Sequence, residues 1–144
     1  MLAVIRIRGK LDKSRDVKET FNRLRLRKKH VCVLLAENES NKGMIHKVKD
    51  FVTYGEIDKA TLKELLEKRG RLAGDKKISN LKEDFVENLL NGKAKLEEAG
   101  IKPFFRLAPP RQGFGRVGIK KGFSERGALG YRGKEINALI KKMM

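Results

Sequence analysis

Two hydrophobic periods alternate along the first 57 residues, and this alternation constrains the fold more than any other feature of the sequence. Short runs rich in Val and Ile are typical of strands, whereas apolar residues that recur every three or four positions are typical of helices. Strand-like runs occur at residues 2–8, 30–36 and 52–54, and helical spacing occurs at residues 15–26 and 44–48. Because each connection contains a helix, this β-α-β-α-β order predicts an α+β or α/β sandwich with helices packed on a small sheet.

The first strand is expected to be half-buried, because its two faces differ in composition. One face carries Ala3, Ile5 and Ile7, and the other carries Val4, Arg6 and Arg8. Ser14 is a suitable N-cap for the helix that follows. The polar segment ENESNKG (37–43) is expected to be loop and cap material before a short second helix.

The middle of the chain has a helical pattern. Asp58 is placed to cap a helix that Gly70 ends, and Asn80 with Glu83 can form the capping box of another helix that ends by Gly92. Acidic and basic residues are mixed along both helices, which is typical of a solvated surface.

The last part of the chain has a different character. The segment IKPFFRL (101–107) has strand character, and Pro103 either restricts this strand to a sheet edge or lies among the first residues of the strand. Residues 109–133 are rich in Gly, Arg and Lys with few large apolar side chains, so we expect this loop to be mobile unless a partner supplies contacts. A final helix (134–142) has an apolar stripe that should dock on the body.

The length of 144 residues is typical of one domain. Within it we expect a β-α-β-α-β core at 1–57, a helical extension of the same domain at 58–100, and a strand, basic Gly-rich loop and helix at 101–144.

Basic residues dominate the composition but are concentrated toward the two ends of the chain. The 35 Lys and Arg against 18 Asp and Glu give a formal net charge of +17. Residues 1–55 carry 14 basic and 6 acidic side chains, residues 56–100 carry 10 of each, and residues 101–144 carry 11 and 2. This distribution predicts a polyanionic partner that is contacted by particular faces of the molecule.

Several other classes of protein are disfavoured. The single cysteine, Cys32, allows neither an intrachain disulfide nor a four-cysteine zinc site, and we interpret it as an inert core thiol. Neither His30 nor His46 has a nucleophile or metal-binding partner beside it in sequence, so we expect no enzyme, metal or cofactor. The longest apolar run, 31–36, is far too short to span a bilayer, and we expect a soluble, cytoplasmic protein.

One motif resembles a nucleotide-binding turn. Gly113, Gly115 and Gly118 form the pattern G-x-G-x-x-G. A dinucleotide site needs a central strand before this pattern and a helix at the third glycine, whereas two prolines precede it here and a helix-poor segment follows. Glycines that let a basic loop approach an RNA backbone explain the same pattern with fewer assumptions.

Five segments match the pattern of a known family. The most distinctive is NKGMIHKVKDFVTYGEID (41–58), and the others, in order, are AVIRIRG, TFNRLRLRKKHVCVLL, GIKPFFRLAPPRQGFGR and GALGYRGKEINALIKKM. Together they resemble the L-thirty family of ribosomal proteins, whose eukaryotic counterparts are called L-seven. The chain has the helical middle and tail that bacterial members lack, and it has no long basic N-terminal arm as in eukaryotic members. The resemblance therefore implies the archaeal type.

The resemblance implies a three-stranded antiparallel sheet with two helices, ferredoxin-like in part, to which the helical middle and the basic loop are added. It also implies that the protein is a structural constituent of the large ribosomal subunit and binds large-subunit rRNA. Neighbouring ribosomal proteins are expected as further partners, and whether the small rRNA of that subunit is also contacted stays open. In such a protein, Arg and Lys neutralise phosphates, while guanidinium groups or aromatic rings stack on unpaired bases.

Three groups of residues match the RNA-facing regions of the family. They are Arg25, Arg27, Lys28 and Lys29; Asn41, Lys42 and Lys47; and Arg111, Arg116, Lys120, Lys121, Arg126 and Arg132. Two alternatives remain. A free regulatory RNA- or DNA-binding protein shares all the charge evidence and differs only in residence on ribosomes. A nucleotide-dependent enzyme that uses the Gly-rich loop predicts saturable nucleotide binding.

Overall fold

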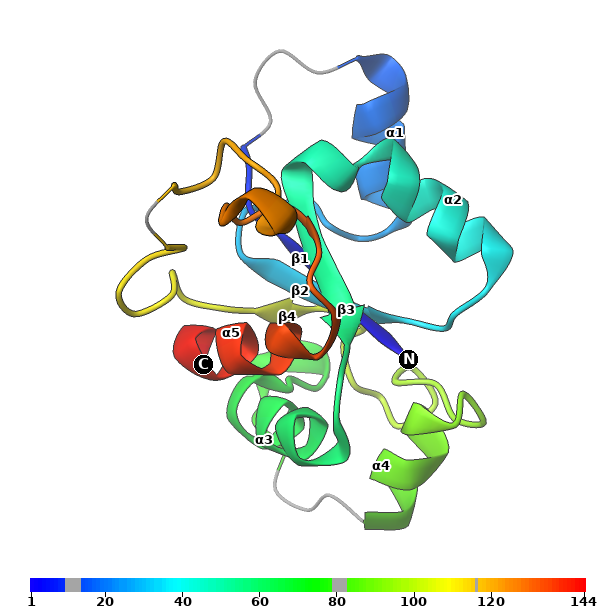
Figure 1. The fold of residues 1–144 in the computed structure, drawn as a ribbon. Helices are drawn as coiled ribbons and strands as arrows, with labels where there is room; N and C mark the ends of the chain where they lie inside the picture. Colours follow the sequence, from blue (N-terminus) through cyan, green and yellow to red (C-terminus); the bar gives the residue numbers. More distant parts are fainter. Residues whose placement is uncertain (10–13, 79–82, 116) are drawn as a thin grey trace.

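The computed structural model describes residues 1–9, 14–78, 83–115 and 117–144 and has an α+β fold, as predicted (Figure 1). Its strands are β1 (Leu2–Arg6), β2 (Val31–Leu35), β3 (Val52–Glu56), β4 (Phe105–Arg106) and β5 (Gly130–Tyr131). Its α-helices are α1 (Arg15–Arg23), α2 (Glu39–Lys47), α3 (Lys59–Arg69), α4 (Glu83–Leu90) and α5 (Ile136–Met143).

The strands form one mixed sheet in the order β4-β2-β1-β3-β5. The central strand β1 is antiparallel to both β2 and β3, so the expected three-stranded antiparallel unit is present. The sheet has two more strands than the three that the resemblance implied, each of two residues: β4 lies in the segment 101–107 that was expected to form a strand, whereas β5 was not expected. β4 pairs with β2 at one edge, which is one of the two positions that Pro103 allowed, and β5 pairs in parallel with β3 at the other edge.

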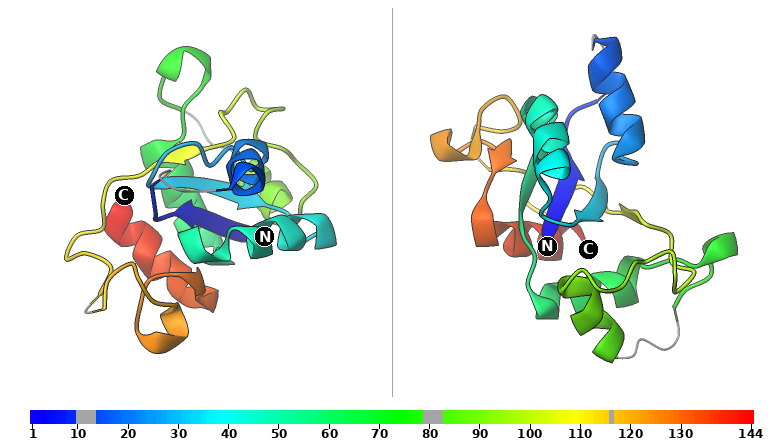
Figure 2. Two further views of the ribbon diagram at one scale, coloured as in Figure 1. Left: turned by 90° about the horizontal axis from the view of Figure 1, so that it is seen from above. Right: turned by 90° about the vertical axis from the view of Figure 1, so that its right-hand side faces the viewer.

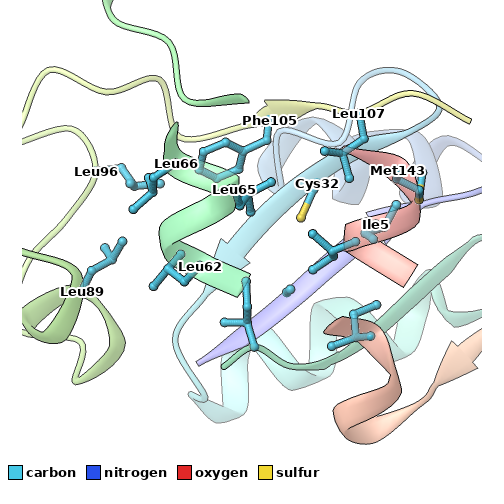
Figure 3. Close-up of a cluster of buried hydrophobic side chains, with 14 of the residues drawn as sticks. Ile5, Cys32, Leu62, Leu65, Leu66, Leu89, Leu96, Phe105, Leu107 and Met143 are labelled. Atoms are coloured by element: carbon cyan, nitrogen blue, oxygen red, sulfur yellow. The ribbon is translucent and has the colours of Figure 1, made fainter. Parts of the chain in front are cut away.

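Apolar clusters cover both faces of the sheet. On one face, Val4 and Val33 belong to a cluster with buried side chains from α1 and α2. On the other face, Ala3, Ile5 and Cys32 pack under α3, α4 and α5 (Figure 3). The prediction of a half-buried first strand was therefore wrong, because distant helices cover the second face as well: all five residues of β1 are buried.

Arg6 is the largest of the fully buried side chains. Its guanidinium donates three hydrogen bonds to backbone carbonyls, from Nη1 to Leu26 (2.6 Å), from Nε to Arg8 (3.0 Å) and from Nη2 to Gly9 (3.0 Å). The Arg6 Cζ atom also lies 3.9 Å from the centroid of the Phe21 ring. Burial lowers the pKa of Arg6 from its usual value, and the hydrogen bonds compensate for the lost hydration.

The helix signals in the sequence were mostly reliable. Asp58 caps α3 by accepting a hydrogen bond from the Thr61 amide at 2.8 Å, and Gly70 follows the last residue of that helix. By contrast, the expectation of a loop through residue 43 was wrong, since α2 begins at Glu39. The first turn of α2 is polar and faces solvent, and for this reason it resembled a loop. The capping residue predicted for α4, Asn80, lies outside the described residues.

The Gly-rich loop is anchored to the body at several points. Ala128 and Leu129 are buried against Ile7, with Phe114 and Ile119 packed around them. The apolar stripe of α5 is buried, as predicted. The sequence had suggested that this loop would be ordered only by a partner. In the described part of the loop, however, a few apolar residues already provide contacts within the chain itself.

Ion pairs join the two helices of the middle segment. Lys59 pairs with Glu87, and Lys63 pairs with Glu83 at 2.7 Å, which joins α3 to α4. These four side chains are substantially exposed, so they form a solvated surface in the way the mixed charges suggested. Within the described part of the chain, no helix is long and apolar enough to cross a bilayer.

The buried Cys32 thiol gives a first prediction. Burial raises the pKa of Cys32 to about 12, so almost none of it is thiolate at pH 8. Ellman's reagent is expected to label less than a tenth of the native protein within the time that labels all of it in guanidinium chloride, and rapid labelling of the native protein would show that this cluster opens.

Candidate nucleic-acid interface

The first predicted group occupies the linker between α1 and β2. Arg25, Arg27, Lys28 and Lys29 are all exposed, whereas Leu26 between them is fully buried. The hydrogen bond from Arg6 to the Leu26 carbonyl fixes the backbone at the same point. The buried leucine thus turns the four flanking cations toward solvent.

His30 connects this linker to the Gly-rich loop. Its ring is stacked on Phe114 with 6.0 Å between centroids and 10° between planes, and its backbone has a φ of 60°. Burial and the nearby charge of Lys29 lower the pKa of His30, which favours the neutral ring in this stack. The stack brings the basic linker and the basic loop to the same end of the sheet.

Arg8 fixes the loop at this end. From the exit of β1, its guanidinium donates to the carbonyls of Ile119 (3.0 Å), Lys120 (3.4 Å) and Asp50 (3.2 Å). The backbones of the Gly-rich loop and of the segment after α2 are therefore held by one side chain. In the right-hand view of Figure 2, the loop (orange) and α1 (blue) both lie on the side toward which the β1 arrow points.

We call this region the basic end of the sheet. It consists of the linker, the Gly-rich loop and the chain around the start of β3. Its exposed cations are Arg25, Arg27, Lys28, Lys29, Lys49, Arg111, Lys120, Lys121 and Arg126. This concentration of positive charge on turns held by buried anchors suits a phosphate backbone.

Members of the third group differ in their surroundings. Lys121 pairs with Glu125 at 3.7 Å, and Arg126 is exposed. Arg132 is half-buried: it donates to Thr53 Oγ1 and the Ala128 carbonyl, both at 3.0 Å, and its Cζ lies 4.6 Å from the centroid of the Phe123 ring. These contacts give Arg132 a role in holding the loop, and burial lowers its pKa. Arg116 lies outside the described residues.

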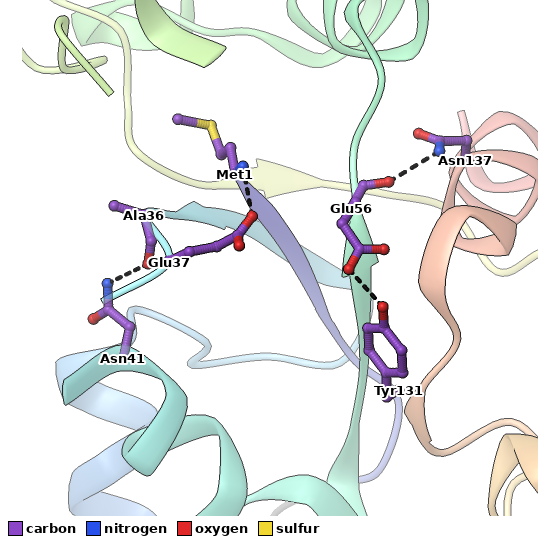
Figure 4. Close-up of polar contacts among 7 residues, drawn as sticks. All are labelled: Met1, Ala36, Glu37, Asn41, Glu56, Tyr131 and Asn137. Carbon is purple, nitrogen blue, oxygen red and sulfur yellow. Dashed lines mark hydrogen bonds and ion pairs between the residues drawn. The ribbon is translucent and has the colours of Figure 1, made fainter. Parts of the chain in front are cut away.

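Part of the second group lies at the opposite end of the sheet. Asn41 donates from Nδ2 to the Ala36 carbonyl at 2.9 Å, which secures the turn into α2 close to the ion pair between the Met1 amino group and Glu37 (Figure 4). Lys42 and Lys47 are exposed and line a hollow that also contains carboxylates and both tyrosines. The structure does not gather these residues with the other two groups.

Sequence reasoning missed three arginines that face the same region. Arg8 was placed on a strand face without a specific contact, and Arg23 and Arg106 were not included in the three predicted groups. Arg23 and Arg106 line one hollow together with Arg25, Arg27 and Lys28. The sequence did contain one indication that Arg106 could belong to the interface, namely its position on a predicted edge strand.

The G-x-G-x-x-G segment is not a nucleotide-binding turn. All three glycines have φ between 67° and 100°, and no helix opens at the third. The mechanism that such a motif serves needs that helix N-terminus, so the structure supports the prediction of a basic loop rather than a dinucleotide site. The described residues hold no group of His, Cys, Asp and Glu side chains that could bind a metal ion.

Known proteins resemble the chain over nearly its whole length. A sequence profile described as "Ribosomal protein L30p/L7e" matches residues 2–52. The "Large ribosomal subunit protein uL30" of Methanococcus vannielii is 52% identical over 99% of this chain and 98% of its own length. The proteins of the same name from Nanoarchaeum equitans and Archaeoglobus fulgidus are 47% and 43% identical, over 97% and 99% of this chain and 96% and 99% of their own lengths.

The chain belongs to the L30p/L7e family of ribosomal proteins. This confirms the resemblance noted in the sequence, including its archaeal character, since these relatives come from archaea. L30p/L7e proteins are structural components of the ribosome and not enzymes, which sets aside the nucleotide-dependent alternative.

The geometry of the loop gives a second prediction. A Cβ atom added to Gly127 would lie 2.1 Å from the Lys121 carbonyl oxygen, whereas one added to Gly122 would meet only atoms at 3.7 Å or more. Gly127→Ala is expected to displace the loop, lower stability by about 1–3 kcal/mol and weaken RNA binding, although it removes no charge.

Gly122→Ala is the matched control for this loop, because the same methyl group makes only ordinary van der Waals contacts there. Denaturant unfolding and filter binding measure both effects. If the two variants have the same stability and the same affinity for RNA, the loop does not have a fixed geometry.

Proposed function

We propose that the protein is a structural constituent of the large ribosomal subunit that binds and stabilises folded large-subunit rRNA through the basic end of the sheet. The observation that carries this proposal is the convergence of two separate basic segments, the linker after α1 and the Gly-rich loop, at one end of the sheet. The names of the relatives from three archaea support residence on the large subunit.

The chemistry of the proposed contact is mainly electrostatic. Folded rRNA brings phosphates close together, and cations on both segments offset their repulsion while releasing condensed counterions. The guanidinium groups can also form paired hydrogen bonds with phosphate oxygens. Since the turns are held by Arg6, Arg8 and the stack of His30 on Phe114, the cations are positioned before RNA binds, which reduces the entropy lost on association.

The proposed partners are large-subunit rRNA and neighbouring ribosomal proteins. The balanced, ion-paired surface of α3 and α4 suits solvent or a protein neighbour better than RNA. As part of a ribosome, the protein would reside in the cytoplasm.

A charge-neutralising variant tests this proposal. Replacing Arg111, Arg116, Lys120 and Lys121 with Gln is expected to weaken binding to large-subunit rRNA. The slope of log Kd against log salt should also flatten by about three, since each of the four lost phosphate contacts removes about 0.7 to 0.9 of a unit. Filter binding across a salt series measures both quantities.

The control carries four Gln substitutions at exposed lysines of the balanced middle segment, Lys59, Lys68, Lys93 and Lys95. It changes the net charge by the same amount and should leave the slope close to that of the unaltered protein. If both quadruple variants flatten the slope equally, only overall charge matters and the proposed interface is wrong.

A further inference from the structure

Phe104 lies between two cationic hollows at the β4 edge of the sheet. The first has a volume of about 470 Å³ and is lined by Arg23, Arg25, Arg27, Lys28 and Arg106 around Phe104. The second, of about 190 Å³, is lined by Phe104 and Arg106 again, with Arg69, Arg71, Lys102 and Asp75. Phe104 and Arg106 line both hollows, and their side chains form the wall between them.

The ring is fixed in place without being covered. Phe104 is half-buried and packs against the cluster under α1 and α2, and the backbone next to it is held because Phe105 and Arg106 pair with Cys32 and Val31. The Arg106 Cζ atom lies 5.8 Å from the centroid of the Phe104 ring, close enough for a cation–π interaction. An aromatic ring that is held in place and only half-buried is suited to stacking, because part of the ring stays accessible to a base.

The charges around the ring favour an anionic ligand. Arg25 pairs with Glu97 at 2.5 Å and Arg23 with Glu19 at 2.6 Å. Among the described residues, Arg27, Lys28 and Arg106 have no ion pair, and no carboxylate lines the first hollow. In the second hollow, the one carboxylate, that of Asp75, is already paired with Lys102.

We propose that Phe104 and Arg106 form a stacking site for an unpaired nucleotide of RNA. The base lies on the Phe104 ring within the first hollow, Arg27 and Lys28 bind the phosphate on one side, and Arg71 binds the phosphate on the other side. A paired helix offers phosphates but no accessible base face, so an aromatic wall between two basic hollows selects single-stranded RNA. This inference rests on the proposed RNA-binding function and specifies the form of RNA at one part of its interface.

The test uses a short single-stranded RNA that contains 2-aminopurine, whose fluorescence is quenched by stacking, and a hairpin of the same length as competitor. Phe104→Leu is expected to reduce affinity for the single strand by about 5- to 150-fold and to remove the quenching, with the salt slope unchanged. Phe104→Tyr keeps an aromatic ring and should restore both affinity and quenching.

Two controls separate stacking from other effects. Phe85→Leu alters a similarly half-buried ring on α4 and should leave binding unchanged. Arg27→Gln with Lys28→Gln should flatten the salt slope by about 1.4 while the quenching of the bound complex persists. Circular dichroism establishes that each variant is folded.

Two outcomes would overturn the stacking site: an unaltered protein that binds the hairpin as tightly as the single strand without quenching, or a Phe104→Leu variant with full affinity and quenching. The first outcome would show that the hollows bind the phosphates of paired RNA without a stacked base. Failure of the chain to bind large-subunit rRNA, with quenching of the short RNA intact, would instead remove the proposed ribosomal function and keep the stacking site.

Discussion

The buried guanidinium of Arg6 is the constraint on which the rest of the structure depends. It lies at the end of the central strand, and its three hydrogen bonds reach the carbonyls of Arg8 and Gly9, where the chain leaves the sheet, and of Leu26, in the linker that returns to it. A buried cation without partners is strongly destabilising, so the chain must present these carbonyls whenever the core forms. The position of the basic linker is therefore coupled to the packing of the core.

The geometry of the proposed interface also depends on this coupling between buried residues and the basic segments. Buried anchors alternate with exposed cations along both basic segments: Leu26 lies within the linker, and Ala128 and Leu129 follow the lysines of the loop. Arg8 and His30 then bring the two segments together at one end of the sheet. Like charges that would repel in a free chain are thus held side by side by interactions within the protein. Binding of a polyanion, as proposed, would relieve this repulsion, and this accounts for the regional distribution of the charge.

Local sequence patterns predicted the structural features that depend on neighbouring residues. They failed for features that depend on contacts with distant segments of the chain. Periodicity was sufficient to predict β1 to β3 and the presence of the helices, although not the start of α2, and Asp58 and Gly70 marked the ends of α3. No local pattern could predict β5, whose two residues form a strand only because β3 lies beside them. For the same reason Arg6 was placed on an ordinary strand face. Within the site, charge density located the linker and the loop, whereas Phe104 and Arg106 acquire their neighbours only when β4 pairs with β2.

The most direct test of the central claim, that this chain is an integral, RNA-bound part of the large ribosomal subunit, is sucrose-gradient sedimentation of native cell extract. The chain is detected across the gradient before and after a high-salt wash that strips loosely bound factors. The account predicts co-migration with the large subunit through the wash, because multiple positioned phosphate contacts dissociate slowly as a set. Recovery only at the top of the gradient would contradict the account and would favour a free RNA-binding protein.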